Sequence, residues 1–466
     1  MDLKRFVIGE SVEPMQMLDA RESRVQRQRE IQRRFPMPLV SFTLNIPGSI
    51  KVFPLSVETF TEGMELIRCH CKARGIPIRN VEETRGATGW EGFLSVDAPA
   101  KKVKAALVLI EESCTLGRLM DIDVLDSGGE MLSRTELGYP ARTCPLCGSP
   151  AFVCSRSRVH PVEKLLEFEC AVMEDYFAQR YAEGAASAAA RALLYEVLTT
   201  PKPGLIDKRN NGAHDDMDLT TFENSALVLI PYFKEFIAHG IKHWNTPPER
   251  LLDGLREIGV KAEISMLRTT GGVNTHKGII FSMGILSAAM GMCWGKGELP
   301  SRQQLRWLSQ AIVAPIESDF QGLTVENAVS HGERLYVQYG LKGARGEAMA
   351  GFPTLFETAL PRLDQLLLEG WDLNDAGVAV LLEILSVSED SNVAARSSWK
   401  RMLELSMQAR DILEEGNDRA RLLAAAKKLD DALIAEKISP GGSADLLALS
   451  YYVHFLEREG FMTPSS

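Results

Sequence analysis

Two aspartates, Asp121 and Asp123, lie two residues apart within the apolar segment 116–124. On a β-strand, residues i and i+2 point to the same face, so both carboxylates would converge on one point. Such a pair suits a divalent metal, because Mg²⁺ is usually held by one or two carboxylates together with substrate phosphates. Two acids on a solvated strand face are the alternative. The apolar neighbours Ile122 and Val124, which would face a core, favour the metal site.

Three polar residues near this segment, Asn45, Lys51 and Arg118, could meet phosphate oxygens. Asn45 follows a β-rich segment and starts a Pro-Gly turn, Lys51 follows that turn, and Arg118 lies three residues before Asp121. At each position an ordinary surface loop is the alternative. Nucleotidyl transfer, which needs a metal and phosphate ligands together, is the chemistry that this combination would serve.

Cys144, Cys147, Cys154 and His160 are separated by gaps of two, six and five residues, which resembles a zinc knuckle. A four-ligand zinc site is therefore possible. The short middle gap and three nearby arginines count against it, so zinc is not the favoured interpretation. We expect instead that these arginines face phosphate, because guanidinium groups bind phosphate oxygens in pairs; they are Arg142, Arg156 and Arg158.

A dense polar segment in the second part contains His214, Asp215, Asp216 and Asp218. If Asp215 begins a helix, Asp215 and Asp218 share a face and could bind a metal or act as a general base. The alternative is an acidic first turn that stabilises the positive end of a helix dipole.

The motif 271–278 precedes an apolar helix predicted at 279–294. Amides at the start of that helix and Lys277 would form an anion site. The motif is not a Walker A loop, because His276 and Gly278 stand where that pattern requires glycine and serine or threonine. Further loops carry polar residues that core packing would not require, and together they predict one polar pocket between helices. They contain Arg345, Glu347, Asp390, Asn392, Arg396 and Asp445.

The elements that must position these residues differ between the two parts of the chain. Segments 39–44, 92–97 and 117–125 read as strands that alternate with helices at 57–75 and 98–112, which indicates an α/β or α+β domain. From residue 169 onward helix-forming segments follow one another and strand signals nearly vanish, which predicts an all-α bundle. No linker rich in proline, glycine or serine separates the parts, so a helix could join them.

Composition supports two globular domains in a chain of 466 residues, of which 45% are hydrophobic and 24% charged. Residues 1–168 contain 23 basic and 22 acidic side chains, whereas residues 169–466 contain 29 and 40. The net charge of −10 argues against a protein that holds nucleic acid by charge. Residues 1–34 lack the pattern of a secretory signal, and eight cysteines without one predict a reducing, cytoplasmic location. The apolar run 279–294 is too short to cross a bilayer, so we expect a core helix and no membrane partner.

Longer motifs of the first part resemble the apo-citrate lyase phosphoribosyl-dephospho-CoA transferase family, also called holo-citrate lyase synthase, over about residues 15–165. They are Asn45-Ile-Pro-Gly48 with Lys51, Thr88-Gly-Trp-Glu91, the segment 116–124, Ser133-Arg134, and Arg142 to His160.

Motifs of the second part resemble triphosphoribosyl-dephospho-CoA synthase over about residues 185–460. They are Thr200-Pro-Lys-Pro-Gly204, the segment 212–218, the segment 271–278, Gly343-Ala-Arg-Gly-Glu347 and Ser439-Pro-Gly-Gly-Ser-Ala-Asp445. One departure is Ser391, where the family pattern leads us to expect threonine.

The resemblance implies a fusion of two consecutive enzymes. An α/β (α+β nucleotidyltransferase-like) domain at 1–168 would transfer phosphoribosyl-dephospho-CoA to a serine of the citrate lyase acyl carrier subunit, releasing pyrophosphate. An all-α domain at 169–466 would make the precursor from ATP and 3′-dephospho-CoA, releasing adenine. Mg²⁺ is the expected cofactor of both steps.

The resemblance also implies roles for individual residues. Asp121 and Asp123 would be catalytic metal ligands, with Asn45, Lys51, Arg118 and Arg134 as phosphate partners. In the second domain His214, Asp216 and Asp218 would serve as base and, for the two aspartates, as metal ligands. The remaining candidates would bind substrate: Lys202, Asn274, His276, Lys277, Arg345, Glu347, Asp390, Asn392, Arg396 and Asp445.

Three other interpretations stay open at this point. The chain could be a docking scaffold for CoA or a carrier, without turnover. The segment 144–160 could be a zinc-dependent regulatory or nucleic-acid-binding element, which the net charge disfavours. The carrier could also be that of a related malonate decarboxylase.

Overall fold

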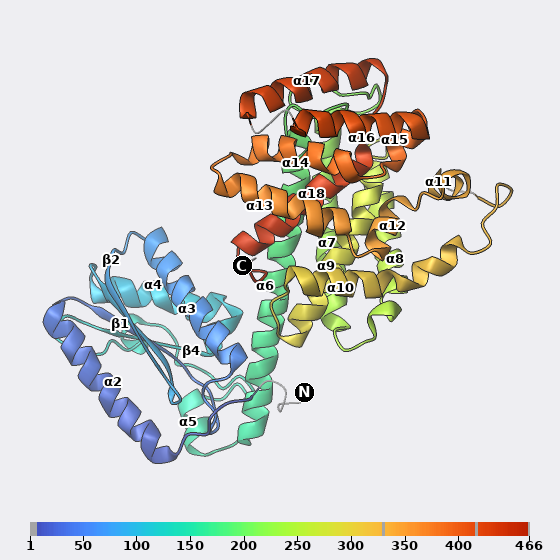
Figure 1. Cartoon of the computed structure of the whole chain (residues 1–466). Helices are drawn as coiled ribbons and strands as arrows, with labels where there is room; N and C mark the ends of the chain where they lie inside the picture. The colour runs from blue at the N-terminus through green and yellow to red at the C-terminus, as the bar shows by residue number, and fades with distance from the viewer. Residues whose placement is uncertain (1–6, 329–330, 415–417, 465–466) are drawn as a thin grey trace. The chain divides into compact units, whose positions relative to one another are not determined.

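The computed structural model describes residues 7–328, 331–414 and 418–464 and divides the chain into two compact units (Figure 1). Unit 1 is Met1–Phe177 and unit 2 is Ala178–Ser466. The division falls inside one continuous helix, α6 (Val162–Leu198). The expectation that a helix connects the two parts is therefore confirmed.

Unit 1 is built on a four-stranded sheet in the order β2-β3-β1-β4, in which every neighbouring pair is antiparallel. The strands are β1 (Leu39–Leu44), β2 (Ile78–Gly86), β3 (Gly89–Val96) and β4 (Met120–Leu125). Unit 1 is thus an α+β domain. The alternative of a parallel α/β sheet is wrong, because β2 and β3 form a hairpin and β1 pairs with antiparallel neighbours on both sides.

Three details of unit 1 differ from the sequence prediction. Strand β2 was not predicted, since a half-exposed edge strand with charged residues carries little apolar signal. The expected polar turn at 88–91 is shorter, because Gly89, Trp90 and Glu91 already belong to β3. Gly117 and Arg118 lie in the 3-10 helix η1 (Thr115–Arg118), and the strand begins only at Met120.

Helices cover both faces of this sheet. Helix α2 (Pro14–Arg34) packs Ile31 onto Leu39, Phe93 and Leu125 of one face. Helix α3 (Pro54–Ala73) covers the other face, where Phe60 stacks on Phe42 with ring centroids 5.1 Å apart. Helix α4 (Ala100–Ser113) packs against α3 and β4. The face below α2 is the one that carries the predicted aspartates.

The described residues of unit 2 form helices and loops without a strand, as expected. Its longer helices are α7 (Leu219–Lys242), α8 (Leu252–Thr269), α9 (Lys277–Lys296), α10 (Arg302–Val313), α14 (Leu373–Val387), α16 (Trp399–Glu414), α17 (Arg419–Ala435) and α18 (Gly441–Arg458). Shorter ones are η3 (Pro248–Arg250), η4 (Ala314–Phe320), α11 (His331–Tyr339), α12 (Gly343–Met349), η5 (Thr354–Ala359), α13 (Leu360–Leu368) and α15 (Ser391–Arg396).

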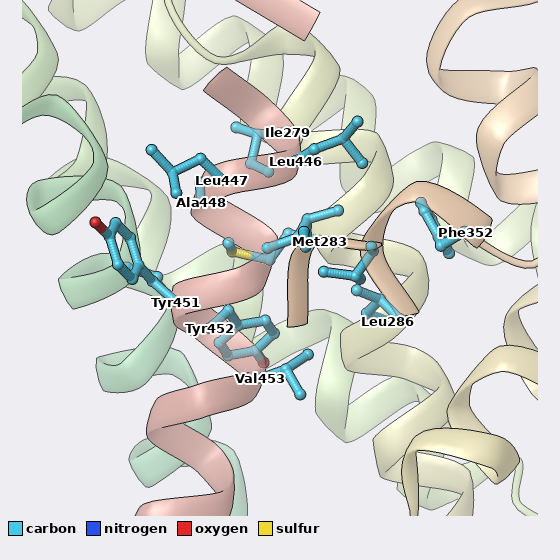
Figure 2. Packing of buried hydrophobic residues seen from close by; sticks show 14 of the residues in the cluster. Ile279, Met283, Leu286, Phe352, Leu446, Leu447, Ala448, Tyr451, Tyr452 and Val453 are labelled. Atoms are coloured by element: carbon cyan, nitrogen blue, oxygen red, sulfur yellow. The ribbon is translucent and has the colours of Figure 1, made fainter. Parts of the chain in front are cut away.

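Helix α9 lies in the core of unit 2. It is long and apolar enough to span a membrane, but 83% of its most apolar window is buried inside the protein, which confirms the expected core helix. Figure 2 shows α9 side chains such as Met283 beside Tyr452 of α18. Glycines allow α7 to approach α9 closely, since a Cβ at Gly240 or Gly291 would overlap the backbone of the other helix. This core fixes the first turns of α9 and α18, where polar residues gather.

Candidate active sites

The predicted acids of unit 1 lie in a row across three strands. Asp121 of β4 and Glu91 of β3 both stand opposite Thr43 of the central strand β1. Asp123 stands opposite Ser41, two residues along the same face. Residues directly opposite in antiparallel strands share a face, so the expectation that both aspartates point to one side is confirmed.

Helix α2 supplies basic and amide partners to this face. Arg24 Nε lies 2.6 Å from Glu91 Oε1, and Gln28 donates to Ser41 Oγ at 3.0 Å. Burial and then the Asp121 carboxylate raise the pKa of Asp123, because a second negative charge is unfavourable there. A cation at this place would relieve that repulsion.

A cavity of about 130 Å³ opens beside the row and is lined by three of the predicted residues, Asn45, Lys51 and Asp121. Arg21, Arg24, Thr43 and Glu91 are among its other lining residues. Lys51 Nζ donates to the Ile46 carbonyl at 2.5 Å, which holds the ammonium at the turn after β1. Burial lowers the pKa of Lys51. The structure therefore brings two arginines of α2, one lysine and two carboxylates to the same cavity.

Glu169 of α6 interacts electrostatically with Lys51, and burial raises its pKa to about 8. A carboxyl group with a raised pKa keeps its proton in the folded state, so stability falls as the pH rises from the unfolded value towards 8. We expect unit 1 to lose about 2 to 3 kcal/mol of stability between pH 6 and pH 8, and Glu169→Gln to remove most of that loss. The stability of unit 1 at each pH is measured by urea unfolding, followed by hydrogen exchange of peptides from residues 39–125.

Glu167→Gln is the matched control, because Glu167 lies two residues before Glu169 on α6 and forms a surface ion pair with Lys164 at 3.1 Å. It should retain the wild-type pH dependence. An equal pH slope in Glu169→Gln and the wild type would contradict the assignment.

Arg118 and Arg134 lie in a second cavity of unit 1, of about 220 Å³, and not beside Asn45 and Lys51. Arg134 pairs with Glu111 at 3.2 Å and with Glu112 at 2.6 Å. Arg142 connects the two places, since its guanidinium lies 2.6 Å from Glu111 Oε1 and 3.8 Å from Asp121 Oδ1. Fold geometry thus brings Arg142 to the acid row, whereas the sequence indicated only a general affinity for phosphate.

Cys144, Cys147, Cys154 and His160 come together in the structure. Their ligand atoms all lie within 4.8 Å of one another, so this group could bind a metal. The six-residue gap that counted against the site contains the start of helix α5 (Ala151–Arg156), which carries Cys154 back towards Cys144. Arg156 and Arg158 are exposed, and neither lines a cavity described above.

Unit 2 contains a cavity of about 330 Å³ lined by eight of the predicted residues. They are Lys202, His214, Asn274, His276, Lys277, Asn392, Arg396 and Asp445. These residues come from five separate segments of the chain. Of the six loop residues predicted to line one polar pocket between helices, Asn392, Arg396 and Asp445 line this cavity, so that prediction is confirmed in part.

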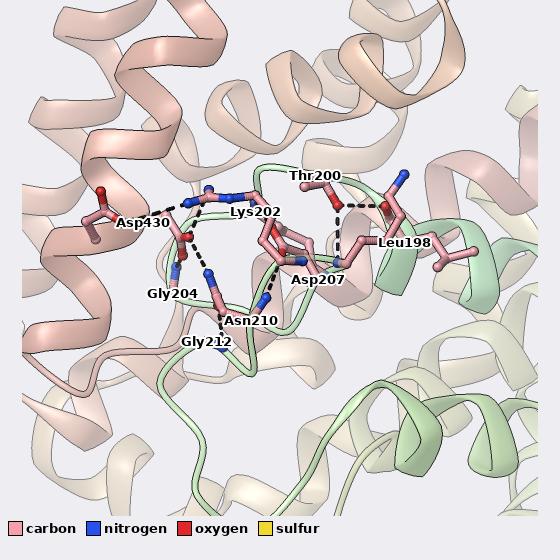
Figure 3. Close-up of polar contacts among 11 residues, drawn as sticks. Leu198, Thr200, Lys202, Gly204, Asp207, Asn210, Gly212 and Asp430 are labelled. Carbon is pink, nitrogen blue, oxygen red and sulfur yellow. Dashed lines mark hydrogen bonds and ion pairs between the residues drawn. The ribbon is translucent and has the colours of Figure 1, made fainter.

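The loop after α6 is held in place by carboxylates (Figure 3). Asp207 accepts from the backbone amides of Lys202 and Asn210, both at 3.1 Å. Asp430 of α17 accepts from the Gly204 amide at 2.9 Å and from the Asn210 side chain at 3.1 Å. These contacts across more than 200 residues of sequence fix the backbone that presents Lys202 to the cavity.

Lys202 forms a buried ion pair with Glu196 of α6 at 2.5 Å, and both side chains line the cavity. Burial raises the pKa of Glu196, and the Lys202 charge opposes that shift. Glu196 was not among the predicted residues. An acid inside the apolar run 192–198, six residues before Lys202, is the signal that could have revealed it.

We expect Glu196→Ala to destabilise unit 2 by about 3 to 5 kcal/mol, because it leaves the Lys202 ammonium buried without a partner. Replacing both residues with methionine should cost much less. Urea unfolding by tryptophan fluorescence in a Trp90→Phe background measures unit 2 alone, since the other five tryptophans lie in it.

Glu183→Ala is the control on the same helix, because Glu183 forms an exposed pair with Lys234 at 2.7 Å. Its loss should cost at most about 1 kcal/mol. Equal losses of stability in Glu196→Ala and Glu183→Ala would show that the buried ion pair contributes no more than the exposed one.

His276, at the N-cap of α9, is 4% exposed and is neutral at ordinary pH, because burial lowers its pKa to about 3. Its Nδ1 lies 2.6 Å from Ser225 Oγ, which accepts a hydrogen bond from Thr275 at 2.7 Å. If Ser225 donates to Nδ1, the ring proton lies on Nε2. Within the described part of the chain that buried atom has no hydrogen-bond partner, so it is available to a ligand oxygen.

Asp445 lies on the first turn of α18 against the start of α9, where a Cβ at Gly278 would overlap its carboxylate. Burial, followed by the charges of Glu196 and Asp390, raises its pKa well above the ordinary value. Asp445 and Ser391 also line a neighbouring cavity of about 490 Å³, together with Glu347 and Asp390. Asp445 therefore stands in the wall that the two cavities share.

Asp390 and Glu347, which line this second cavity, accept hydrogen bonds from backbone amides. Asp390 accepts from the Ser443 amide at 2.7 Å and from the Asn392 amide at 2.9 Å, so it fixes the first turn of α18. Glu347 accepts from the Thr354 amide at 2.8 Å. Ser391, the departure from the family pattern, presents its hydroxyl position to both cavities.

Three predicted residues do not line either cavity of unit 2: Asp216, Asp218 and Arg345. The expectation that Asp215 and Asp218 share a helix face is wrong, because α7 begins only at Leu219. Asp218 is its N-cap and accepts from the Thr221 amide at 2.8 Å. Asp216 is exposed, 3.8 Å from His214 Nδ1, while His214 Nε2 contacts Ser439 Oγ at 2.8 Å inside the cavity. Arg345 lies over the Phe320 ring.

Comparison with known families matches both parts of the chain. Residues 182–463 match the family ATP:dephospho-CoA triphosphoribosyl transferase, and residues 12–176 match the family apo-citrate lyase phosphoribosyl-dephospho-CoA transferase. Protein CitXG of Haemophilus influenzae is 33% identical over 468 residues, with 97% of each chain covered. Protein CitXG of Leuconostoc mesenteroides is 33% identical over 465 residues, covering 96% of this chain and 98% of its own.

Relatives of the second part also occur without the first. The 2-(5″-triphosphoribosyl)-3′-dephosphocoenzyme-A synthase of Escherichia fergusonii is 40% identical over 283 residues, which cover 60% of this chain and 93% of that protein. The chain is thus a bifunctional transferase of citrate lyase maturation. It belongs to the CitXG family, in which the two transferases are fused.

Proposed function

We propose that residues 169–466 join ATP to 3′-dephospho-CoA with release of adenine, and that residues 1–168 transfer phosphoribosyl-dephospho-CoA to a serine of the citrate lyase acyl carrier subunit. The observation that carries this division is the presence of two separate polar sites, one in each unit, at the residues that the family motifs contain. The family matches end at residue 176 and begin at residue 182, on either side of the division between the units.

In the second domain the 2′-hydroxyl of dephospho-CoA attacks C1′ of the ATP ribose, the bond from C1′ to adenine breaks, and adenine takes up a proton. We assign acceptance of the hydroxyl proton to the ionised form of Asp445, because Asp445 lines both cavities and a carboxylate of raised pKa holds an accepted proton more strongly than an ordinary aspartate. His214 is the second candidate, since burial lowers its pKa and keeps the ring neutral. Lys202, Lys277 and Arg396 would bind phosphates.

The other predicted residues of this domain serve substrate binding in the proposal. Asn274, Asn392 and the Nε2–H group of His276 would donate to ligand oxygens. Glu347 and Asp390 would shape the adjoining cavity. Arg345 and Asp216 would act at the rim, Asp216 as a carboxylate for the Mg²⁺ of the nucleotide, and Asp218 would hold this loop through its cap.

In the first domain the carrier serine attacks the α-phosphorus of the triphosphate, and the bond to pyrophosphate breaks. A nucleotidyltransferase-like arrangement is supported by carboxylates of neighbouring strands beside basic residues. Asp121 and Asp123 would hold Mg²⁺, which neutralises phosphate charge when bound. The hard oxygen donors and the repulsion that raises the pKa of Asp123 fit this ion. Asn45, Lys51, Arg118, Arg134 and Arg142 would bind phosphate groups.

The partners in this proposal are ATP, 3′-dephospho-CoA and the carrier protein, and we place the reactions in the cytoplasm. A malonate decarboxylase carrier is the competing acceptor, which only a direct comparison of carriers separates. Nucleic acid and membranes have no part in the proposal.

The proposal is tested by incubating the purified chain with ATP, Mg²⁺ and 3′-dephospho-CoA, with and without the apo carrier. We expect adenine release without the carrier, and pyrophosphate release with a carrier mass gain only when it is present. Absence of both products alongside active single-domain relatives would support the scaffold interpretation. Labelling of the malonate carrier alone would change the acceptor.

A further inference from the structure

We infer that Cys144, Cys147, Cys154 and His160 bind one zinc ion in a tetrahedral structural site. The set contains three sulfur donors and one imidazole, which is a common ligand set for structural zinc. All four ligand atoms lie within 4.8 Å of one another. Tetrahedral zinc with bonds of about 2.3 Å to sulfur places its sulfur atoms about 3.8 Å apart. Only small shifts are therefore needed to close the site.

The backbone around the first two cysteines is already a knuckle. Gly148 has a φ of +72°, a conformation that glycine adopts without strain. Its amide donates to the Cys144 carbonyl at 2.9 Å, and the Cys144 amide donates to the Ser149 carbonyl at 2.6 Å. These two backbone bonds close a tight turn that holds Cys144 and Cys147 near each other.

The turn that brings His160 back to the cysteines contains a strained backbone conformation. Arg158 has a φ of +47°, a left-handed conformation that is unfavourable for a residue with a Cβ. This turn, with the Val159 amide bonded to the Cys154 carbonyl at 3.2 Å, brings His160 back to the cysteines. The Nε2 atom of His160 is buried, and no residue in the described part of the chain hydrogen-bonds to it. A metal bond would use that unsatisfied nitrogen and offset the strain.

A disulfide is the competing use of these cysteines. Cys144 and Cys154 sulfur atoms lie 3.4 Å apart, well beyond the roughly 2.05 Å of a disulfide bond. A disulfide between Cys144 and Cys154 would also leave Cys147 and His160 beside each other without a common ligand. The geometry therefore favours one ion shared by four ligands.

The cysteine cluster lies next to the backbone segment that contains Arg142. The Arg142 carbonyl accepts from the Ala151 amide at 2.9 Å, Thr143 bridges to Pro150, and the Thr143 carbonyl accepts from Arg118 at 3.3 Å. Zinc would thus fix the loop from which Arg142 reaches Glu111 and Asp121. In this role Arg142 is positioned by the metal site, and this part of the inference rests on the proposed function of unit 1.

Metal analysis of the purified full chain tests the site itself. We expect about one zinc ion per chain, and loss of that ion in Cys147→Ser, whose side chain is at the surface and can change without disturbing a core. Cys69→Ser is the matched control, because Cys69 is equally exposed and lies on α3 outside the cluster. Cobalt(II) in place of zinc should give the intense visible absorption of a tetrahedral thiolate site.

Several results would overturn the zinc site. A wild-type chain that contains no zinc and takes up none after reduction, an intramolecular disulfide involving Cys144 or Cys154 by mass spectrometry, or equal zinc content in Cys147→Ser would each do so. A bound iron ion in place of zinc would overturn the identity of the metal. These readouts do not depend on enzymatic activity, so they stand apart from the proposed function.

Chelation tests the positioning of Arg142. Metal-free protein should show carrier transfer reduced about 10-fold to 100-fold, with a raised KM for the triphosphate intermediate, while adenine release stays within about twofold. Added zinc should restore the rate. Unchanged transfer in verified metal-free protein would overturn the positioning role and leave a purely structural zinc site.

Discussion

Asp121→Asn is expected to abolish transfer to the carrier and to leave adenine release unchanged. The substitution keeps the shape of the side chain but removes one of the two carboxylates that face the same point on β4. Loss of a charged oxygen ligand weakens Mg²⁺ binding beside the α-phosphate, and we expect transfer to fall at least about 100-fold. Supplying synthetic triphosphoribosyl-dephospho-CoA and following the carrier mass measures the step alone.

The physical reason for the selectivity is that Asp121 and the adenine-releasing site lie in different units, each with its own core. Asp97→Asn is the matched control, since Asp97 is an exposed acid of unit 1 that pairs with Arg79 at 2.7 Å outside the cavity. It should keep both activities. Loss of both activities in Asp121→Asn would contradict the division of labour.

Asp445→Asn is expected to have the opposite effect, with adenine release reduced roughly 100-fold or more and transfer from supplied intermediate unchanged. The amide cannot accept the proton of the 2′-hydroxyl. Adenine release at saturating ATP and dephospho-CoA measures the loss. Because burial, followed by the charges of Glu196 and Asp390, disfavours the carboxylate, the same substitution should stabilise unit 2 or leave its stability unchanged.

That combination separates a catalytic effect from misfolding. Asp431→Asn is the control, because Asp431 is an exposed acid of unit 2 that lies outside both cavities. It should leave adenine release at the wild-type rate. If Asp445→Asn retained adenine release, the assignment to Asp445 would be wrong, and His214→Gln would test the second candidate.

Local pattern was sufficient for most of the long elements and for part of the site in this protein, although it missed the edge strand β2. The i, i+2 spacing of Asp121 and Asp123 predicts a shared face because a strand alternates its side chains, and β4 bears that out. The long helix-forming run after residue 168 predicts α6, and the apolar run 279–294 predicts a buried helix. The motifs also identify both families, since glycine, proline and acidic residues in fixed order are properties of the chain itself.

Partners distant in sequence could be found only from the tertiary structure. Asp430 holds the Lys202 loop from more than 200 residues away. Arg142 reaches Asp121 because the cysteine loop folds back. None of these contacts leaves a periodic mark in the sequence.

The sequence by itself determined which chemical groups are available, in which elements they lie and which two families they define. The tertiary structure decided which groups meet: Asn45 and Lys51 with Asp121, Asp445 with both cavities of unit 2, and three cysteines with His160. The physical reason is that secondary structure follows from neighbours within a few residues, whereas a site is assembled by packing between segments whose separation along the chain carries no information about their distance in space.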